Sequence, residues 1–326
     1  MRVLVTGASS LLGRATVERL LDRDDDVTCF QRTSSHLDAR EVLGDVRDRE
    51  AVLAAAAGHE AVVHLAALVS PRPRYQDAYD VNVLGTQHAT EAAQRCGRFV
   101  HVSSPSVAFA DAPAVGEGTC PASYDGADAY VATKAIAERH VLARSLVPTV
   151  VIRPHLVWGP GDTQLVDRIV QRAKAGRLRL PDHGRALIDT TYVDDAAASL
   201  VAALDRAEHG SEAQGRAWVV TGNDPRPLAE LVGGILRCAG ITTPPPSITA
   251  PLAARAGRVL DLVWRGPEPP LTYFSARQLS LAHWFDQREV QAALRWSPVI
   301  SVREGLERLA RWYAAGSAEA ARSSSS

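Results

Sequence analysis

Residues 1–21 read MRVLVTGASSLLGRATVERLL, a short apolar run, a glycine-containing turn and then apolar residues at helical spacing. A strand, turn and helix in this order form the context that a dinucleotide-binding turn needs. Gly7 allows a tight turn with positive φ, and Gly13 allows the helix to pack close to the strand. The helix N-terminus would offer free N–H groups to a pyrophosphate. Unrelated strand–turn–helix junctions share these features. The later segments of the sequence must therefore distinguish a dinucleotide-binding turn from an unrelated junction.

The first half of the chain alternates short apolar runs with longer helical patterns. We expect strands at 2–6, 27–30, 41–43, 61–65, 98–102 and 149–153, and helices at 11–21, 51–57, 77–96 and 128–146. Strands that alternate with helices favour a parallel sheet covered on both faces. The pattern therefore predicts a doubly wound α/β sheet of the Rossmann type, with its ligand crevice at the carboxyl ends of the strands.

The composition changes after about residue 163, and 224–275 is rich in proline, which interrupts long elements. We expect a dinucleotide-binding domain over 1–163 that is completed by about 186–223. Residues 164–185 and 224–313 would form a smaller, mostly helical substrate domain. The small and polar residues at 314–326 predict a disordered tail.

Charge and composition exclude several classes of protein. Lys and Arg number 36 against 37 Asp and Glu, so a nucleic-acid partner bound through a broad basic field is not expected. No apolar run is long enough to span a membrane, and the first residues lack the pattern of a secretory signal. Cys29, Cys96, Cys120 and Cys238 form no CxxC pair, which predicts neither a disulfide framework nor a metal site. We expect a cytoplasmic enzyme with a small-molecule substrate.

Tyr130 and Lys134 carry the chemistry that the sequence predicts. Four residues apart on a helix, their side chains lie on one face. A nearby ammonium lowers the pKa of a phenol, ordinarily about 10, and makes the phenol a workable general acid and base. Ser104 follows a predicted strand, where its hydroxyl can hydrogen-bond a substrate oxygen. The YxxxK pattern also occurs on solvated helix faces, but a set of Ser, Tyr and Lys behind a glycine turn is more specific.

At this point the chain resembles the extended short-chain dehydrogenase/reductases, and within them the 3β-hydroxysteroid dehydrogenase-like branch. The superfamily motifs that match are the glycine turn, GDVRD at 44–48, HLAA at 64–67, VNVLGT at 81–86, VSSPSV at 102–107, YVATKAIAE at 130–138, RPHLVWGPGD at 153–162 and TTYVDD at 190–195. The segments PPLTYF at 269–274, HWFD at 283–286 and LRWSPVISVREGL at 294–306 resemble that branch more than the NDP-sugar epimerases.

The resemblance implies specific roles. Tyr130 would be the general acid and base, Lys134 would hold the nicotinamide ribose and lower the pKa of the tyrosine, and Ser104 would orient the substrate oxygen. Asn82 would either support the site or have a structural role. The residues expected to contact the dinucleotide are Gly7, Ser9, Ser10, Leu11, Leu12, Gly13, Asp45, Val46, Ala66, Ala67, Asn82, Tyr130, Lys134, Pro154 and His155. Residues 77–96 and 128–146 would form the interface of a homodimer, if the chain pairs as such enzymes often do.

Two departures from the family pattern bear on the cofactor. Ser10 stands where a glycine is usual, so its hydroxyl either binds the phosphate or displaces the cofactor. No carboxylate ends the second strand, where one would bind the ribose hydroxyls of NAD. Arg32, followed by three hydroxyl residues, suits a 2′-phosphate instead. We therefore expect NADP as the preferred cofactor and keep NAD as the alternative.

The leading functional hypothesis is the interconversion of a secondary alcohol and a ketone by an NAD(P)-dependent oxidoreductase. The branch implies a bulky, largely apolar substrate, such as a sterol, a long-chain β-keto acid or a polyketide-like ketone. One alternative is an NDP-sugar epimerase or dehydratase, whose diphosphate substrate Arg168, Arg172 and Arg185 would bind. The other is a non-catalytic dinucleotide-sensing regulator, although Tyr130 and Lys134 are both retained.

Overall fold

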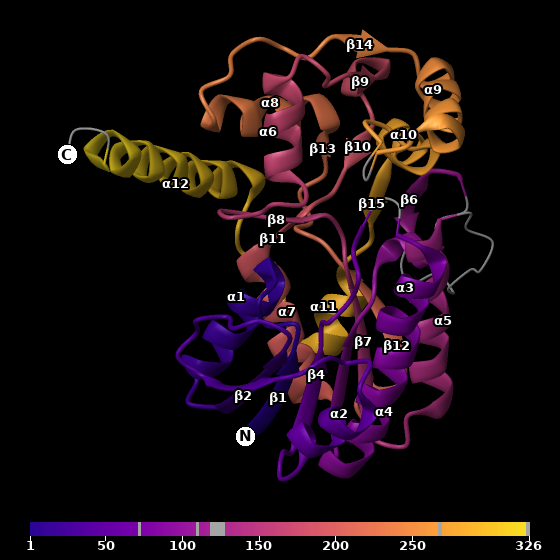
Figure 1. Cartoon of the computed structure of the whole chain (residues 1–326), viewed down its shortest axis with the longest axis vertical. Coiled ribbons are helices and arrows are strands. Elements are labelled where there is room, and N and C mark those ends of the chain that lie inside the picture. Colours follow the sequence, from indigo (N-terminus) through magenta and orange to yellow (C-terminus); the bar gives the residue numbers. More distant parts are fainter. Residues whose placement is uncertain (71–72, 109–110, 118–127, 267–268, 324–326) are drawn as a thin grey trace.

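The structure is a computed structural model that describes residues 1–70, 73–108, 111–117, 128–266 and 269–323. It consists of a large parallel sheet between two layers of helices, with a smaller unit above the carboxyl ends of the strands (Figure 1). This arrangement confirms the predicted doubly wound Rossmann fold.

The large sheet has seven parallel strands in the order β12-β7-β5-β4-β1-β2-β3. Their bounds are β1 Arg2–Thr6, β2 Asp26–Gln31, β3 Arg40–Leu43, β4 Ala61–His64, β5 Phe99–Val102, β7 Thr149–Pro154 and β12 Arg216–Val220. The chain reverses its direction of winding next to β1, between β2 and β4. Ligands of doubly wound sheets bind at such a switch point, beyond the carboxyl ends of the strands.

The helices cover the sheet as its alternating side chains require. Val3 and Val5 point into one core and Leu4 into the other, which is the period of two that a strand dictates. One face carries α1 (Leu11–Leu21), α7 (Val193–Arg206) and α11 (Arg288–Leu294). The other carries α2 (Arg49–Ala56), α4 (Gly85–Cys96) and α5 (Ala129–Arg144). Both faces are buried, so the strands are apolar throughout.

The helix expected at 77–96 is divided into three pieces. An α-helical turn, α3 (Tyr75–Tyr79), leads into a π-helical segment, η1 (Asp80–Leu84), and only then into α4. Gly85 starts α4 close to the loop after β3, because a Cβ there would lie 2.8 Å from Cγ2 of Val46. Single π-turns inside helices are frequent at functional sites.

The smaller unit is built from short elements around a separate core. Its strands are β6 (Ala114–Glu117), β8 (Val157–Trp158), β9 (Leu180–Pro181), β10 (Leu187–Ile188), β11 (Thr191–Tyr192), β13 (Arg226–Pro227), β14 (Ser247–Ile248) and β15 (His283–Phe285). Its helices are α6 (Val166–Lys174), α8 (Leu228–Cys238), α9 (Ala250–Val263), α10 (Tyr273–Ser280) and the short helix η3 (Asp182–Gly184). Another short helix, η2 (Pro105–Ala108), follows β5 of the large sheet. The core holds Trp158, Leu231 and Ile235.

The last part of the chain differs from the expected division in two places. Val290, Leu294 and Trp296 pack into the core of the large sheet, so the chain returns there through α11 within the segment assigned to the substrate domain. Of the tail expected to be disordered at 314–326, the structure describes the residues up to 323, and these continue a helix, α12 (Val302–Ser323), which projects from the body (Figure 1). Alanine, glutamate and arginine in this stretch favour a helix more than small size and polarity predict a coil.

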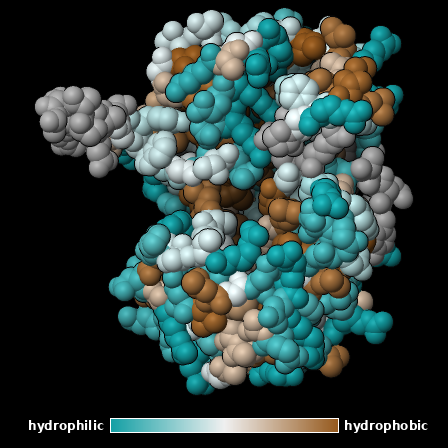
Figure 2. Space-filling model, viewed as in Figure 1, coloured by the Kyte–Doolittle hydropathy of each residue, from teal (hydrophilic) through white to brown (hydrophobic). Residues whose placement is uncertain are grey.

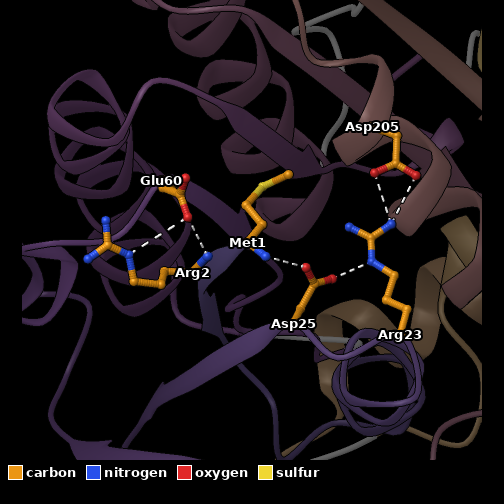
Figure 3. Close-up of polar contacts among 6 residues, drawn as sticks. All are labelled: Met1, Arg2, Arg23, Asp25, Glu60 and Asp205. Atoms are coloured by element: carbon orange, nitrogen blue, oxygen red, sulfur yellow. Dashed lines mark hydrogen bonds and ion pairs between the residues drawn. The ribbon is translucent and has the colours of Figure 1, made fainter.

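Pairs of oppositely charged groups lie at the amino ends of β1 and β2, the opposite end of the strands from the candidate site (Figure 3). The amino group of Met1 lies 2.8 Å from Asp25, which also binds Arg23. Arg23 reaches Asp205 at the end of α7 at 2.9 Å. Although burial opposes it, hydrogen bonds from the Met1 ammonium and Arg23 hold the pKa of Asp25 below its ordinary value. These pairs tie the end of α1 to α7.

No helix of the described residues is both long and apolar enough to cross a bilayer. Cys29, Cys96 and Cys238 are free thiols, and burial raises the pKa of Cys29 and Cys96 to about 11. Cys120 lies outside the described residues.

Candidate active site

The glycine turn brings β1, α1 and the end of β4 into close contact. Gly7 has φ of +77°, and a Cβ on it would lie 2.7 Å from the backbone nitrogen of Ala66. A Cβ on Gly13 would lie 2.2 Å from the carbonyl oxygen of Gly7. Only glycine fits at either position, so the turn and the segment Ala66-Ala67 lie side by side at the switch point.

Ser10 is the N-cap of α1. Its hydroxyl donates to the carbonyl of Gly7 at 2.9 Å and accepts from the N–H of Gly13 at 3.0 Å. The hydroxyl therefore stabilises the turn itself, a role in which serine is favoured over most residues. The N–H groups of Leu11 and Leu12 have no hydrogen-bond acceptor among the described residues. Free N–H groups at the start of a helix fit a pyrophosphate.

Asp45 and Val46 follow β3 at the same edge of the sheet. The Asp45 carboxylate accepts from the guanidinium of Arg47 at 2.6 Å, and the carbonyl of Val46 accepts from His88 at 2.9 Å. Arg47 above all, and the more distant charge of Arg32, hold the pKa of Asp45 below its ordinary value. Arg32 is exposed at the end of β2 and is close enough to Asp45 for their charges to interact.

Glu41 on β3 is a residue that the sequence analysis did not single out. Its carboxylate accepts from the Ser34 hydroxyl and the Ser35 N–H, both at 2.6 Å, and from the Ser35 hydroxyl. The amide of Gln31 adds a fourth contact at 2.9 Å. A carboxylate thus does lie at the end of β2, but it comes from the neighbouring strand. No local sequence signal points to Glu41, because its position depends on its pairing with Cys29 in the adjacent strand.

Tyr130 is held at the start of α5, close to Ser104. Asp128 caps the helix and accepts from the N–H of Tyr130 at 2.8 Å. The phenol of Tyr130 lies within interaction range of the Ser104 side chain, and the hydroxyl of Ser104 lies 2.8 Å from that of Ser106. Burial raises the pKa of Tyr130 to about 12, against the opposing effect of Ser104. The expected lowering of this pKa by Lys134 is not what the structure gives, because burial dominates.

Lys134 lies one turn further along α5 and is buried. Its ammonium donates to the carbonyl of Val102 at 2.6 Å, two residues before Ser104. Burial lowers the pKa of Lys134 to about 8, and the charge of Glu138 opposes this. Glu138, a further turn along the same face, accepts from Nε of Arg153 at 2.8 Å and from its Nη2 at 2.5 Å. Both side chains of this ion pair are only 1% exposed.

Asn82 connects the loop after β4 to α5. Its side-chain oxygen accepts from the N–H of Leu68 at 2.7 Å, and its amide donates to the Thr133 hydroxyl at 3.0 Å. Asn82 is fully buried within the π-helical segment η1. It fixes the segment after Ala66-Ala67 relative to the helix that carries Tyr130 and Lys134.

Pro154 and His155 end β7 at the junction with the smaller unit. Nδ1 of His155 donates to the carbonyl of Asp189 at 2.5 Å, and its ring meets Phe285 edge-on at 5.3 Å between centroids. Burial, helped by the neighbouring His283, lowers the pKa of His155 to about 4. An imidazole held through Nδ1 and packed against Phe285 in this way shapes the junction between the two units.

The sheet therefore gathers two groups of residues at one edge. One group, near the ends of β1 and β2, consists of the glycine turn with its free N–H groups and the exposed Arg32. The other group, at the end of β5 and the start of α5, consists of the hydroxyls of Ser104 and Tyr130 and the buried ammonium of Lys134. Among the described residues, no group of three or more His, Cys, Asp or Glu side chains could hold a metal ion. This arrangement could hold a dinucleotide along the carboxyl ends of the strands, with proton transfer at the Ser104, Tyr130 and Lys134 end.

Comparison with known proteins identifies the family. The model of the NAD dependent epimerase/dehydratase family matches residues 3–220. The chain belongs to this family. Its members are extended short-chain dehydrogenase/reductases, so the resemblance drawn from the sequence motifs is confirmed.

Relatives of this epimerase/dehydratase family member include named oxidoreductases. The chain is 38% identical to a 2-alkyl-3-oxoalkanoate reductase of Stenotrophomonas maltophilia, over 95% of this chain and 98% of the relative. It is 30% identical to a 3 beta-hydroxysteroid dehydrogenase/Delta 5-->4-isomerase of Mycobacterium tuberculosis, over 96% and 90% of the two chains. The protein is accordingly an NAD(P)-dependent short-chain dehydrogenase/reductase.

A solved structure supports the fold of this family member. A short-chain dehydrogenase/reductase superfamily protein from Agrobacterium tumefaciens, solved with bound NAD, aligns with a TM-score of 0.75 at 23% identity, over 99% of this chain and 100% of the other. The sheet order and the covering helices are thus those of known short-chain dehydrogenase/reductases.

Proposed function

We propose that this enzyme reduces a ketone to a secondary alcohol, with Tyr130 as the general acid. The observation that carries the proposal is the position of the Tyr130 phenol, within interaction range of Ser104 and one helical turn from the anchored ammonium of Lys134. A substrate carbonyl oxygen placed between the two hydroxyls would receive two hydrogen bonds, which stabilise the negative charge that develops during reduction. The reductase name of one relative supports this direction of chemistry, and the dehydrogenase name of another supports the same pair of functional groups, a ketone and a secondary alcohol.

The protonation states favour reduction. Because burial raises the pKa of Tyr130 to about 12, the phenol is protonated at neutral pH and can donate its proton to the oxygen of the substrate. Ser104 would orient that oxygen, and Ser106 would hold the hydroxyl of Ser104. Lys134 would bind ribose hydroxyls and place positive charge near the phenolate that remains. When bound, the dinucleotide supplies the hydride, and the protein positions and polarises.

The substrate that we propose is bulky and largely apolar. In Figure 2, hydrophobic residues lie at the base of a hollow between the large sheet and the smaller unit. Apolar side chains around a few polar groups are what a large hydrophobic ligand requires. The names of the relatives, an oxoalkanoate reductase and a hydroxysteroid dehydrogenase, agree with a long-chain or sterol-like ketone.

For the cofactor we propose NADP(H) in preference to NAD(H). Arg32 is the exposed cation at the end of β2, and a guanidinium binds phosphate oxygens in pairs. The family is described as NAD dependent, and both dinucleotides share the turn and the strand ends that are described above.

The experiment that tests the proposed function is the substitution Tyr130→Phe. We expect turnover of a long-chain ketone with NADPH to fall by about 10²–10⁴-fold, the usual size of a general-acid contribution. Binding of the dinucleotide, measured by titration of tryptophan fluorescence, should stay within about twofold, since the ring and its packing are retained.

Tyr75→Phe is the matched control, because Tyr75 lies on α3 and is 52% exposed. It should have the activity of the unaltered enzyme. Full activity of Tyr130→Phe would remove Tyr130 from the mechanism, and equal losses in both variants would show that the loss does not come from the position of the phenol.

A further inference from the structure

We infer that Glu41 determines how strongly the enzyme prefers one dinucleotide, by placing a negative charge next to the position of a 2′-phosphate. The inference rests on the dinucleotide site proposed above. In doubly wound folds a carboxylate after β2 favours NAD, and residues 29–35 at the end of β2 and just after it supply none. The tertiary structure supplies one from β3, and no residue of β2 takes its place.

The carboxylate of Glu41 is fixed in position by the loop that follows β2. Glu41 pairs with Cys29, two residues before the end of the strand, and its side chain reaches back to the loop. One oxygen accepts from Gln31 at 2.9 Å, from the Ser35 N–H at 2.6 Å and from the Ser35 hydroxyl. The other accepts from the Ser34 hydroxyl at 2.6 Å. The group cannot move away from the loop without losing four contacts.

These contacts also change the role expected for the serines. The sequence assigns the hydroxyls after Arg32 to a 2′-phosphate, but those of Ser34 and Ser35 are already donated to Glu41. Arg32 and Thr33 therefore remain as the groups of this loop that are free of Glu41. The phosphate would approach Arg32 on one side and a fixed carboxylate on the other.

The charge of Glu41 is not balanced by an ion pair with any lysine or arginine among the described residues. Hydrogen bonds from Ser34 and Ser35 hold the pKa of Glu41 at about 2, so it is ionised throughout the working range. A dianionic phosphate is repelled by such a charge, whereas the neutral diol of NAD is not. Glu41 thus limits the advantage that Arg32 gives to NADP(H).

The test is Glu41→Gln, which removes the charge and can keep all four contacts. The glutamine oxygen can accept from Gln31 and Ser35, and its amide can donate to the oxygen of Ser34. We expect the dissociation constant of NADP⁺ to fall by at least about fivefold, the size expected for charges several ångströms apart in a solvated site. That of NAD⁺ should change by less than about twofold. Both are measured by calorimetric titration, without turnover.

Ser35→Ala is the matched variant, because it keeps the charge and removes one hydrogen bond to Glu41. It should leave the ratio of the two dissociation constants unchanged. An unchanged ratio in Glu41→Gln, or the same shift in both variants, would overturn the role of Glu41, since the loop contacts and not the charge would then matter. If neither dinucleotide binds the unaltered chain, the proposed function fails as well, and this result is distinct from binding with an unmoved ratio.

Discussion

Arg32 is the residue on which the proposed preference for NADP(H) depends. It is exposed, and its charge acts on Asp45 at the neighbouring strand end. We expect Arg32→Ala to raise the Michaelis constant for NADPH by about tenfold or more, because one charge-assisted contact with a phosphate is lost. The constant for NADH should change by less than about twofold. Steady-state kinetics with both cofactors measure the two effects.

Arg40→Ala is the control for this substitution, since Arg40 is exposed at the opposite end of the short strand β3. It changes the net charge equally without removing the proposed contact. Equal effects of Arg32→Ala on NADPH and NADH would refute a contact with the 2′-phosphate, and equal effects of both substitutions on NADPH would assign the result to general electrostatics.

At the scale of one element, α5 aligns three functional groups along one face. Tyr130, Lys134 and Glu138 follow one another at intervals of four residues, and the last of them is buried against Arg153. We expect Glu138→Gln to lower the free energy of unfolding by about 3–5 kcal/mol, because it removes the carboxylate that pairs with the buried guanidinium of Arg153. Urea unfolding followed by circular dichroism measures the loss.

The double variant Glu138→Gln, Arg153→Met tests the cause of this loss. Because it removes both charges, it should be less destabilised than the sum of the two single variants, by about 1 kcal/mol or more. Simple additivity of the two single effects would show that the two charges are not coupled, and the loss of the ion pair would not explain the destabilisation.

At the scale of the whole molecule, buried histidines make stability depend on pH. Burial, with the charge of Lys134, lowers the pKa of His64 to about 3 and that of His101 well below its ordinary value. Burial also lowers the pKa of His155 and His283 to about 4. The unfolded chain binds more protons than the folded chain below about pH 6.5, so stability must fall as the pH falls from there to about 4. Urea unfolding at several pH values measures this.

His101→Phe tests whether the buried imidazoles cause this dependence. Neither nitrogen of His101 has a hydrogen-bond partner among the described residues, so phenylalanine removes a titrating group without removing a known contact. We expect a shallower fall of stability between pH 6.5 and 4. His209→Gln, at an exposed position, should leave the slope unchanged. An unaltered slope in His101→Phe would contradict the explanation. Asp189, whose pKa burial raises to about 6, acts in the opposite direction.

The sequence predicted correctly those features that depend on a single helix, strand or turn. The strand–turn–helix at the start, the alternation of strands and helices, and the shared face of Tyr130 and Lys134 depend on backbone preferences and side-chain period, which the chain expresses over a few residues. The π-helical segment around Asn82 was not predictable in this way, because its apolar spacing resembles that of an ordinary helix. The helical end of α12 was missed because composition outweighed helix propensity in the prediction.

The sequence by itself determined the doubly wound sheet, the dinucleotide turn and the types of group available for chemistry, since each follows from residues that are neighbours along the chain. Only the tertiary structure decided which groups meet and in what state. Register between β2 and β3 brings Glu41 to a loop whose own sequence lacks a carboxylate. Burial raises the pKa of Tyr130, so its phenol stays protonated, and lowers the pKa of Lys134, so its ammonium loses a proton more readily. Pairing across strands and removal from water are properties of the assembled fold, which no local stretch encodes.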